Sequence, residues 1–166
     1  MGHLVHNFSG WLETTRLSML IQEVTWIIPL VQTLHILSIA IVISSIFMID
    51  LRLVGLGVRS QPTAAVVQRF LPWVWYALIV LLLSGSVLII GEPGRSLENP
   101  AFRLKMLMLV TAIVLTVLFQ QPLRSNPQFW ERSGLRKAGS IGIAVVSMML
   151  WTGVLFAGRW IAYTGE

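Results

Sequence analysis

The stretch IIPLVQTLHILSIAIVISSIFMI, residues 27–49, runs for 23 residues without a charged side chain. A helix needs about 20 apolar residues to cross the hydrocarbon core of a bilayer, so this stretch predicts a transmembrane helix. Three further windows of similar length follow at residues 70–90, 101–121 and 138–160. The runs are apolar on all sides instead of alternating, which favours helices over the strands of a membrane barrel. The sequence therefore predicts an all-α integral membrane four-helix bundle, a single domain over residues 1–166.

The composition narrows the class of protein further. Of 166 residues, 55% are hydrophobic and 11% charged, there is no cysteine, and the mean hydropathy is +0.78. This excludes a soluble enzyme, a disulfide scaffold and any site built on thiolates. A calculated pI of 10.8 would suggest nucleic acid in a soluble protein. Here the 12 Lys and Arg are interpreted as charges that orient the spans, so the expected partner is the lipid bilayer and no nucleic acid.

The distribution of these basic residues predicts the orientation of the chain. Seven lie in the connections at residues 50–69 and 122–137, and five lie on the opposite side of the spans. Because loops rich in Lys and Arg stay in the cytoplasm, both termini are predicted to face the periplasm.

Residues 8–23 precede the first span and carry apolar side chains at helical spacing. Phe8, Trp11, Leu12, Met19 and Leu20 share one face, which predicts a single amphipathic helix in the membrane interface. His3 and His6 stand before this helix and are expected to belong to a flexible arm.

His35 is the main candidate for chemistry. It lies eight residues into the first span, about 12 Å below the membrane surface, where an ionisable side chain is by default a hypothesis of function. Steps of three and four residues connect Gln32, His35, Ser38, Val42 and Ser45, so the polar members share one face, which is expected to turn into the bundle. The alternative is a neutral imidazole that donates a hydrogen bond to Gln32, a serine or a backbone carbonyl.

Lys105 opens the third span on the same side of the membrane as His35. With Arg103 it is placed to pair with the propionates of a haem held by His35, or with another anionic group. The alternative is a lysine that reaches lipid phosphate. Trp151 is the one tryptophan deep enough in a span to suggest contact with a cofactor. A haem would have one histidine ligand in the spans, with methionine or no residue at the other axial position.

Copper is the second possible metal, because the seven methionines and His35 have the soft ligands that Cu(I) prefers. No two methionines stand three or four residues apart within a span, so a thioether site would have to form between helices. Asp50, at the other end of the first span, is expected to pair with a cation, because an anion opposes the dipole at a helix C-terminus.

Several motifs resemble an uncharacterised family of bacterial four-span inner-membrane proteins. They are WIIPLVQTLHILSIA (26–40), DLRLVGLG (50–57), LPWVW (71–75), FRLKMLML (102–109) and GRWIAYT (158–164). The histidine of the first span and the lysine of the third are more distantly similar to membrane proteins of the copper-resistance D type and to HemJ-type protoporphyrinogen oxidases. This resemblance implies a bacterial inner membrane, and haem b bound by His35 with Lys105 beside it. The closer family often has Phe-His where this chain has Phe119-Gln120, so any activity that needs a second histidine there is in doubt.

Three functions follow from these observations. The first is a haem b redox or electron-transfer protein that exchanges electrons with quinone or a periplasmic partner. The second is a non-catalytic subunit of a larger membrane complex or a homo-oligomer, and the third is a copper or small-solute transporter. The sequence does not decide whether the protein is an enzyme.

Overall fold

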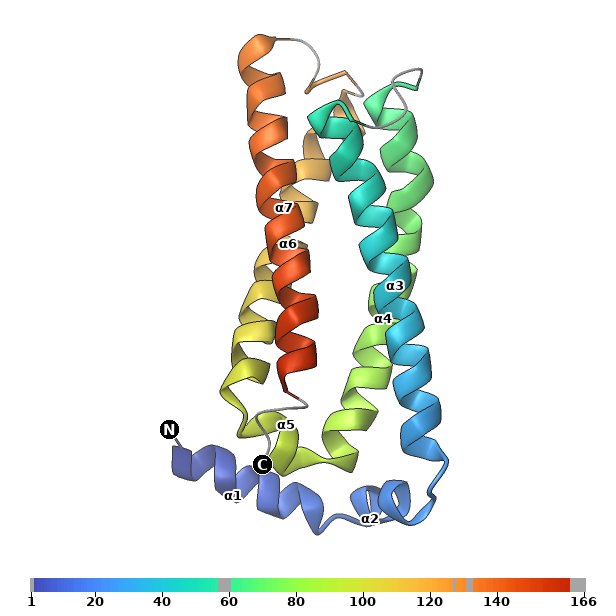
Figure 1. Cartoon of the computed structure of the whole chain (residues 1–166), viewed down its shortest axis with the longest axis vertical. Helices are drawn as coiled ribbons and strands as arrows, with labels where there is room; N and C mark the ends of the chain where they lie inside the picture. The colour runs from blue at the N-terminus through green and yellow to red at the C-terminus, as the bar shows by residue number, and fades with distance from the viewer. Residues whose placement is uncertain (1, 57–60, 127, 131–132, 162–166) are drawn as a thin grey trace.

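The computed structural model describes residues 2–56, 61–126, 128–130 and 133–161, and within these ranges the chain is entirely helical apart from turns and short connections. The four long helices are α3 (Ile27–Val54), α4 (Thr63–Gly91), α6 (Pro100–Ser125) and α7 (Gly134–Trp160). Each contains a window long and apolar enough to cross a membrane. Thus the chain is a multi-pass membrane protein built as a four-helix bundle, as the apolar windows predicted (Figure 1).

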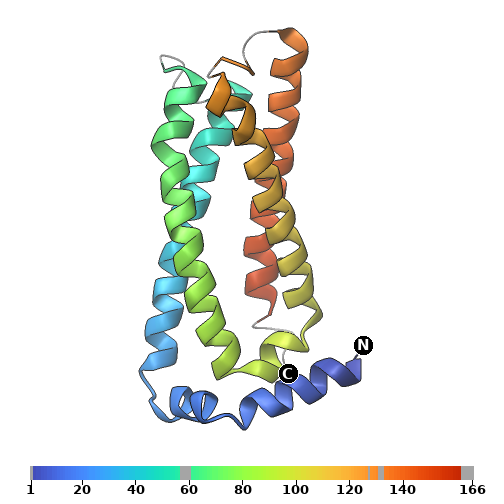
Figure 2. The ribbon, with the colours of Figure 1, turned by 180° about the vertical axis from the view of Figure 1, so that it is seen from behind.

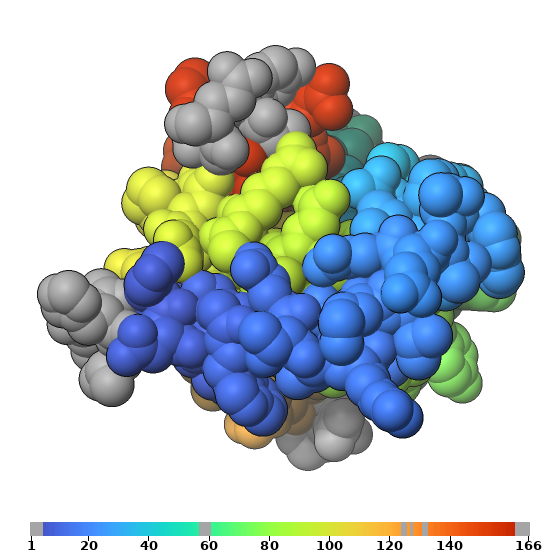
Figure 3. Space-filling model, turned by 90° about the horizontal axis from the view of Figure 1, so that it is seen from below, coloured from blue at the N-terminus to red at the C-terminus, as the bar shows by residue number. Residues whose placement is uncertain are grey.

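Three short helices cover one end of the bundle, here called the α1 end. They are α1 (Gly2–Glu13), α2 (Arg16–Glu23) and α5 (Pro93–Leu97). Seen from below, α1 and α2 lie across this end, with α5 exposed beside them (Figure 3). The opposite end, here called the far end, carries the connections that follow α3 and α6 (Figure 1).

The predicted single helix over residues 8–23 is two helices, and the break has a local cause. The hydroxyls of Thr14 and Thr15 each donate to a carbonyl three residues back, at 2.7 Å. The oxygen of Thr15 then accepts from Ser18 N and caps α2. Threonines thus satisfy the backbone groups that a helix end exposes, and the chain turns between α1 and α2.

α1 begins at Gly2, so the predicted flexible arm is also wrong. His6 lies in α1, and its Nδ1 is 3.0 Å from Glu98 Oε1. Ser9 Oγ donates to the same carboxylate oxygen at 2.7 Å. These bonds attach α1 to the connection between α5 and α6. The side chain of His3 lies outside the described residues.

The ends of the long helices follow from the sequence. The side chain of Asn99 caps α6, and that of Ser133 caps α7. Gly55 ends α3 at φ +88°, a left-handed conformation that glycine adopts without strain. Pro72 lies inside α4, which continues through it from Thr63.

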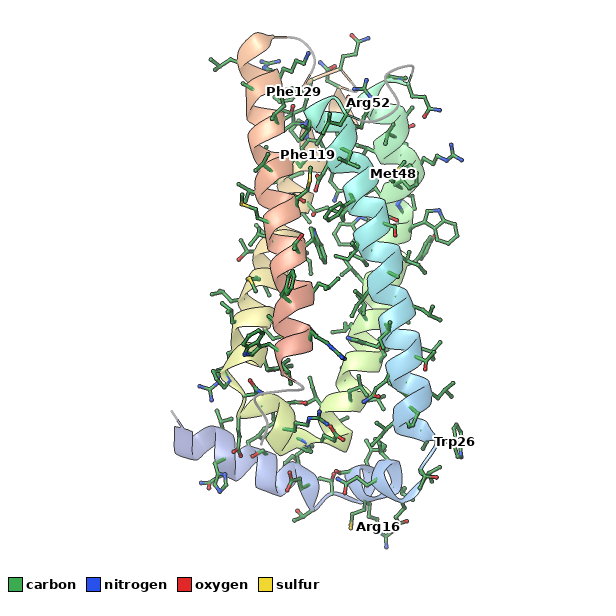
Figure 4. All side chains as sticks on the ribbon, in the orientation of Figure 1. Arg16, Trp26, Met48, Arg52, Phe119 and Phe129 are labelled. Atoms are coloured by element: carbon green, nitrogen blue, oxygen red, sulfur yellow. The ribbon has the colours of Figure 1, made fainter. Side chains whose placement is uncertain are left out.

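The spans pack as two pairs. α3 packs against α4, α6 packs against α7, and the pairs join through α3 and α7. Within the described chain, α4 and α6 make no comparable contact, and they stand apart in the view from behind (Figure 2). Side chains at both ends are seen in Figure 4: Trp26 and Arg16 mark the α1 end, Arg52 and Phe129 the far end, and Phe119 lies between the helices.

Candidate functional site

The imidazole of His35 makes a hydrogen bond that fixes which ring nitrogen is free. Its Nδ1 lies 2.8 Å from Ser84 Oγ on α4. The Ser84 hydroxyl lies 2.7 Å from the carbonyl oxygen of Val80, which can only accept. A serine has one hydroxyl hydrogen, so Ser84 donates to Val80 and accepts from Nδ1–H. In this tautomer Nε2 carries no proton and keeps a lone pair that can bind a metal.

A glycine makes room for this ring. A Cβ on Gly85 of α4 would lie 3.4 Å from Cε1 of His35, closer than most side chains approach each other. His35 is half-buried in this position. The ring therefore packs against α4 at Gly85, and its Nδ1 bonds to Ser84.

Lys105 approaches the same region from the other helix pair. On α6 its side chain runs over Gly158 of α7, where a Cβ would lie 3.5 Å from Nζ. The charge of Lys105 is near enough to act on His35. The structure thus brings together the two residues singled out in the first and third spans.

The site forms one layer of a regular bundle. One layer, here called the polar layer, consists of His35, Ser84, Lys105 and Gly158. Seven residues along each helix lies a member of the next layer, which consists of Val42, Ala77, Ala112 and Trp151 in the same order. Seven residues are two helical turns, or about 10 Å. A further step of seven reaches Ile49, Phe70, Phe119 and Ala144, which form the core near the far end. Two of these layers are apolar, whereas the layer nearest the α1 end contains imidazole, hydroxyl and ammonium groups.

The half of the bundle at the α1 end has almost no apolar core. Along residues 27–41, 78–91, 100–111 and 152–160, the only buried hydrophobic residue is Ala157. From Val42 to the far end, by contrast, all four spans bury apolar side chains in two connected clusters. The inner faces around His35 and Lys105 are therefore only half covered by the chain itself.

The remaining predicted site residues lie elsewhere. Gln32 is exposed, so the face that turns inward begins at His35 and continues through buried Ser38 and Ser45. Arg103 is exposed, on a different side of α6 from Lys105. Trp151 is 2% exposed and belongs to the apolar layer two turns away, where its Nε1 has no hydrogen-bond partner among the described residues. Their part in cofactor binding stays a prediction.

The donor set limits the kinds of metal site. No three His, Asp or Glu side chains come together in the part of the chain that the structure describes. Met108 lies one turn from Lys105, and its sulfur would be 2.9 Å from a Cβ on Gly153. Gln120, at the position of the missing second histidine, is buried beside Phe119 and stands two layers away from His35. A ligand at position 120 is therefore too distant to share one haem with His35.

A shallow groove opens above this layer at the α1 end. It has a volume of about 490 Å³ and is lined by Glu13, Gln22, Ile28, Gly91, Glu92, Pro93 and Arg95. Ile28 and Gly91 stand seven residues from His35 and Ser84, so the floor of the groove is about 10 Å from the polar layer.

Sequence reasoning missed the neighbours that complete the site. Ser84, Gly85 and Gly158 are not among the residues that the sequence analysis singled out. The signal that identifies them is the seven-residue spacing, which places Ser84 and Gly158 at the level of His35 and Lys105.

Comparison with known proteins adds one finding. A family of unknown function, DUF6644, matches residues 8–164. The chain belongs to this family. No curated protein and no solved structure matches it. The match spans α2 and all four long helices, so the polar layer of this DUF6644 protein lies wholly within the family's shared region. The distant likeness to copper-resistance D-type and HemJ-type proteins has no support in these comparisons and stays a prediction.

Proposed function

We propose that this DUF6644 protein is a haem b-binding redox protein of a bacterial inner membrane, with His35 as axial ligand. The observation that carries the proposal is the free Nε2 of His35, oriented by Ser84 in a half of the bundle that lacks its own apolar core. A neutral imidazole held by a second hydrogen bond is the form in which histidine binds metals.

The residues present fit such a group. Gly85 and Gly158 let the side chains of His35 and Lys105 pack directly against α4 and α7. Lys105 supplies a cation for a carboxylate near the imidazole, and Arg103, two residues earlier, could supply a second near the membrane surface. Haem b, when bound, supplies a one-electron redox centre.

The separation of α4 and α6 supports access from the side. These helices make no contact comparable to that within the two helix pairs, and the α1 half buries few apolar side chains, so we propose that an apolar molecule approaches the polar layer from the lipid on this side. The groove at the α1 end offers a second, polar approach for an electron-transfer partner. Quinone and a periplasmic protein are the corresponding partners, with both termini placed in the periplasm.

Absorption spectroscopy of the purified full chain tests the proposal. The protein, produced with ample haem, is expected to show a Soret band that shifts on addition of dithionite, and His35→Ala is expected to abolish it. His6→Ala removes an exposed histidine of α1 and serves as the matched control, which should keep the band.

Two results would contradict the proposal. One is a colourless wild-type protein; a stable co-purifying partner would then favour an accessory subunit, and stoichiometric copper would favour the transporter. The other is a Soret band of full strength in folded His35→Ala, which would place any haem elsewhere.

A further inference from the structure

Asp50 is a buried carboxyl group for which the described residues provide no cationic partner. It lies on α3 near the far end and is 4% exposed. Ser147 of α7 hydrogen-bonds to its side chain, but Oδ2 has no hydrogen-bond partner among the described residues. No ion pair of Asp50 with a cation is found among the described residues, and the side chains of Arg59, Arg124 and Arg132 lie outside them.

The carboxyl group borders a small cavity. Its volume of about 20 Å³ is enough for one water molecule. All four spans line it, and its polar members are Asp50, Thr116 and Ser147. The Thr116 hydroxyl donates to the carbonyl oxygen of Ala112 at 2.8 Å, which leaves its oxygen free to accept. A molecule in the cavity would thus meet three oxygen atoms in otherwise apolar surroundings.

No charge in the lining balances an ionised carboxylate. Among the described residues, Asp50 is the only ionisable one that borders the cavity, and those of α4, α6 and α7 in its lining are uncharged. Two described cations near this end of the bundle have other contacts: Arg52 of α3 donates to the carbonyl oxygen of Gln61, and the guanidinium of Arg69 on α4 lies 5.9 Å from the ring centre of Phe70. An unpaired charge in such a place is costly, whereas a neutral carboxylic acid can both donate and accept.

We infer that Asp50 and this cavity form a hydrated proton-binding site, in which the protonated carboxyl group is hydrogen-bonded to one water molecule. Oδ2 has no partner in the part of the chain that the structure describes, and a water molecule between Asp50, Thr116 and Ser147 would supply one. The site lies 15 residues from His35 on the same helix, about 22 Å away, and four residues from the end of α3. It is therefore separate from the His35 site and does not depend on the proposed function.

Infrared spectroscopy of the full chain in lipid bilayers tests this inference. At neutral pH we expect a carbonyl stretch of a protonated carboxylic acid that shifts in D2O and is lost in Asp50→Asn. Glu92→Gln, which changes a carboxyl group outside the spans, is the matched control and should leave the band in place. Absence of the band at neutral pH, or its survival in Asp50→Asn, would overturn the inference.

If Asp50→Asn does not fold, variants of Thr116 and Ser147, whose hydroxyl groups border the cavity, provide a second test. Thr116→Val and Ser147→Ala remove neighbours of the cavity and should move the frequency of the Asp50 band. They should also remove an O–H band of weakly bonded water that shifts in oxygen-18 water. An unmoved carboxyl band, or no such water band in the wild type, would contradict the hydrated site. Loss of the carboxyl band on adding Na⁺ or Li⁺ would show that the cavity takes a cation instead.

Discussion

One hydroxyl group decides which nitrogen of His35 is available. The Ser84 hydroxyl lies 2.7 Å from the Val80 carbonyl oxygen and 2.8 Å from His35 Nδ1. Because the carbonyl oxygen can only accept, the hydroxyl donates to it and accepts from Nδ1, which places the imidazole proton on Nδ1. Without it, the proton could occupy either nitrogen. Such a bond also restricts rotation of the ring, which raises affinity for a metal held by the other nitrogen.

Ser84→Ala tests this role. The variant keeps His35 but removes the group that orients it, so haem should dissociate faster, by about 10–100-fold as is typical for such supporting contacts. The measurement is the rate of haem transfer from the protein to an apo-globin. Ser86→Ala is the matched control, because that exposed serine donates only to Leu82 O within its own helix. Equal rates for both variants would remove Ser84 from the account.

The sequence identified individual site residues only where a polar or ionisable side chain stands inside an apolar span. An imidazole and an ammonium group within apolar runs stand out, and the structure brings His35 and Lys105 into one layer. Gln32 was also assigned to the inward face, but it lies one turn nearer the α1 end and is exposed. Ser84 and Gly85 are common residues in a span, and only contact with His35 gives them a role.

At the scale of elements, α1 is held to the bundle by a small polar cluster. Glu98 receives hydrogen bonds from Ser9 and His6, which hold the pKa of its carboxyl group below the ordinary value of 4.5. A carboxyl group with a lowered pKa stabilises the folded state above its ordinary pKa. This contribution is lost as the pH falls through the lowered value.

Attachment of α1 should therefore depend on pH. Backbone amides of α1 should be protected from hydrogen exchange at neutral pH and lose protection as the pH falls below 4.5. Glu98→Gln should show the faster exchange already at neutral pH, whereas Glu23→Gln on α2, exposed, should behave as the wild type. Rates are compared after correction for the intrinsic effect of pH. Unchanged protection in Glu98→Gln would show that other contacts hold α1.

The long elements were predictable and the short ones were not. Apolar runs of about 20 residues have one stable form in a bilayer, so the four spans followed from length alone. The division between α1 and α2 depends instead on two threonine hydroxyls, which donate to backbone carbonyl oxygens that would otherwise accept helical hydrogen bonds. The difference in free energy between one continuous helix and two helices is therefore local and small. The order of α1 depends on Glu98, which is more than 80 residues away in the sequence.

The whole molecule is asymmetric along its long axis. Two apolar layers fill the half toward the far end, and a polar layer occupies the half toward the α1 end. Trp151 is the largest side chain of the middle layer and is 2% exposed, packed with Val42, Val74 and Ala112. Stability should therefore reside in the far half, which leaves the polar layer free to serve a ligand.

Substitution of Trp151 tests this division. Trp151→Ala should lower the free energy of unfolding by about 3–5 kcal/mol, because it leaves a cavity in the core. Trp151→Phe should cost much less, since it keeps an aromatic ring and removes an N–H without a partner. Trp160→Ala, 61% exposed at the end of α7, is the control and should have little effect. Reversible unfolding in mixed micelles measures all three; equal losses for the two alanine variants would refute a core centred on Trp151.

The four-helix bundle was predictable from the sequence, but the way in which its helices pack was not. The apolar windows do not indicate that α4 and α6 stand apart while α3 packs on α7. An apolar side chain is equally stable against lipid and against another helix, so its presence does not show which helices pack together. The polar layer depends on this arrangement, since it places residues of two helix pairs at one level.

Ligation by His35 is tested most directly with His35→Gly, which leaves a space that free imidazole can enter. The purified variant should lack the Soret band, and added imidazole should restore both the band and its response to dithionite, as Ser84 remains in place to receive the added ring. A Soret band in His35→Gly without imidazole, or a wild-type protein that binds no haem, would contradict the account.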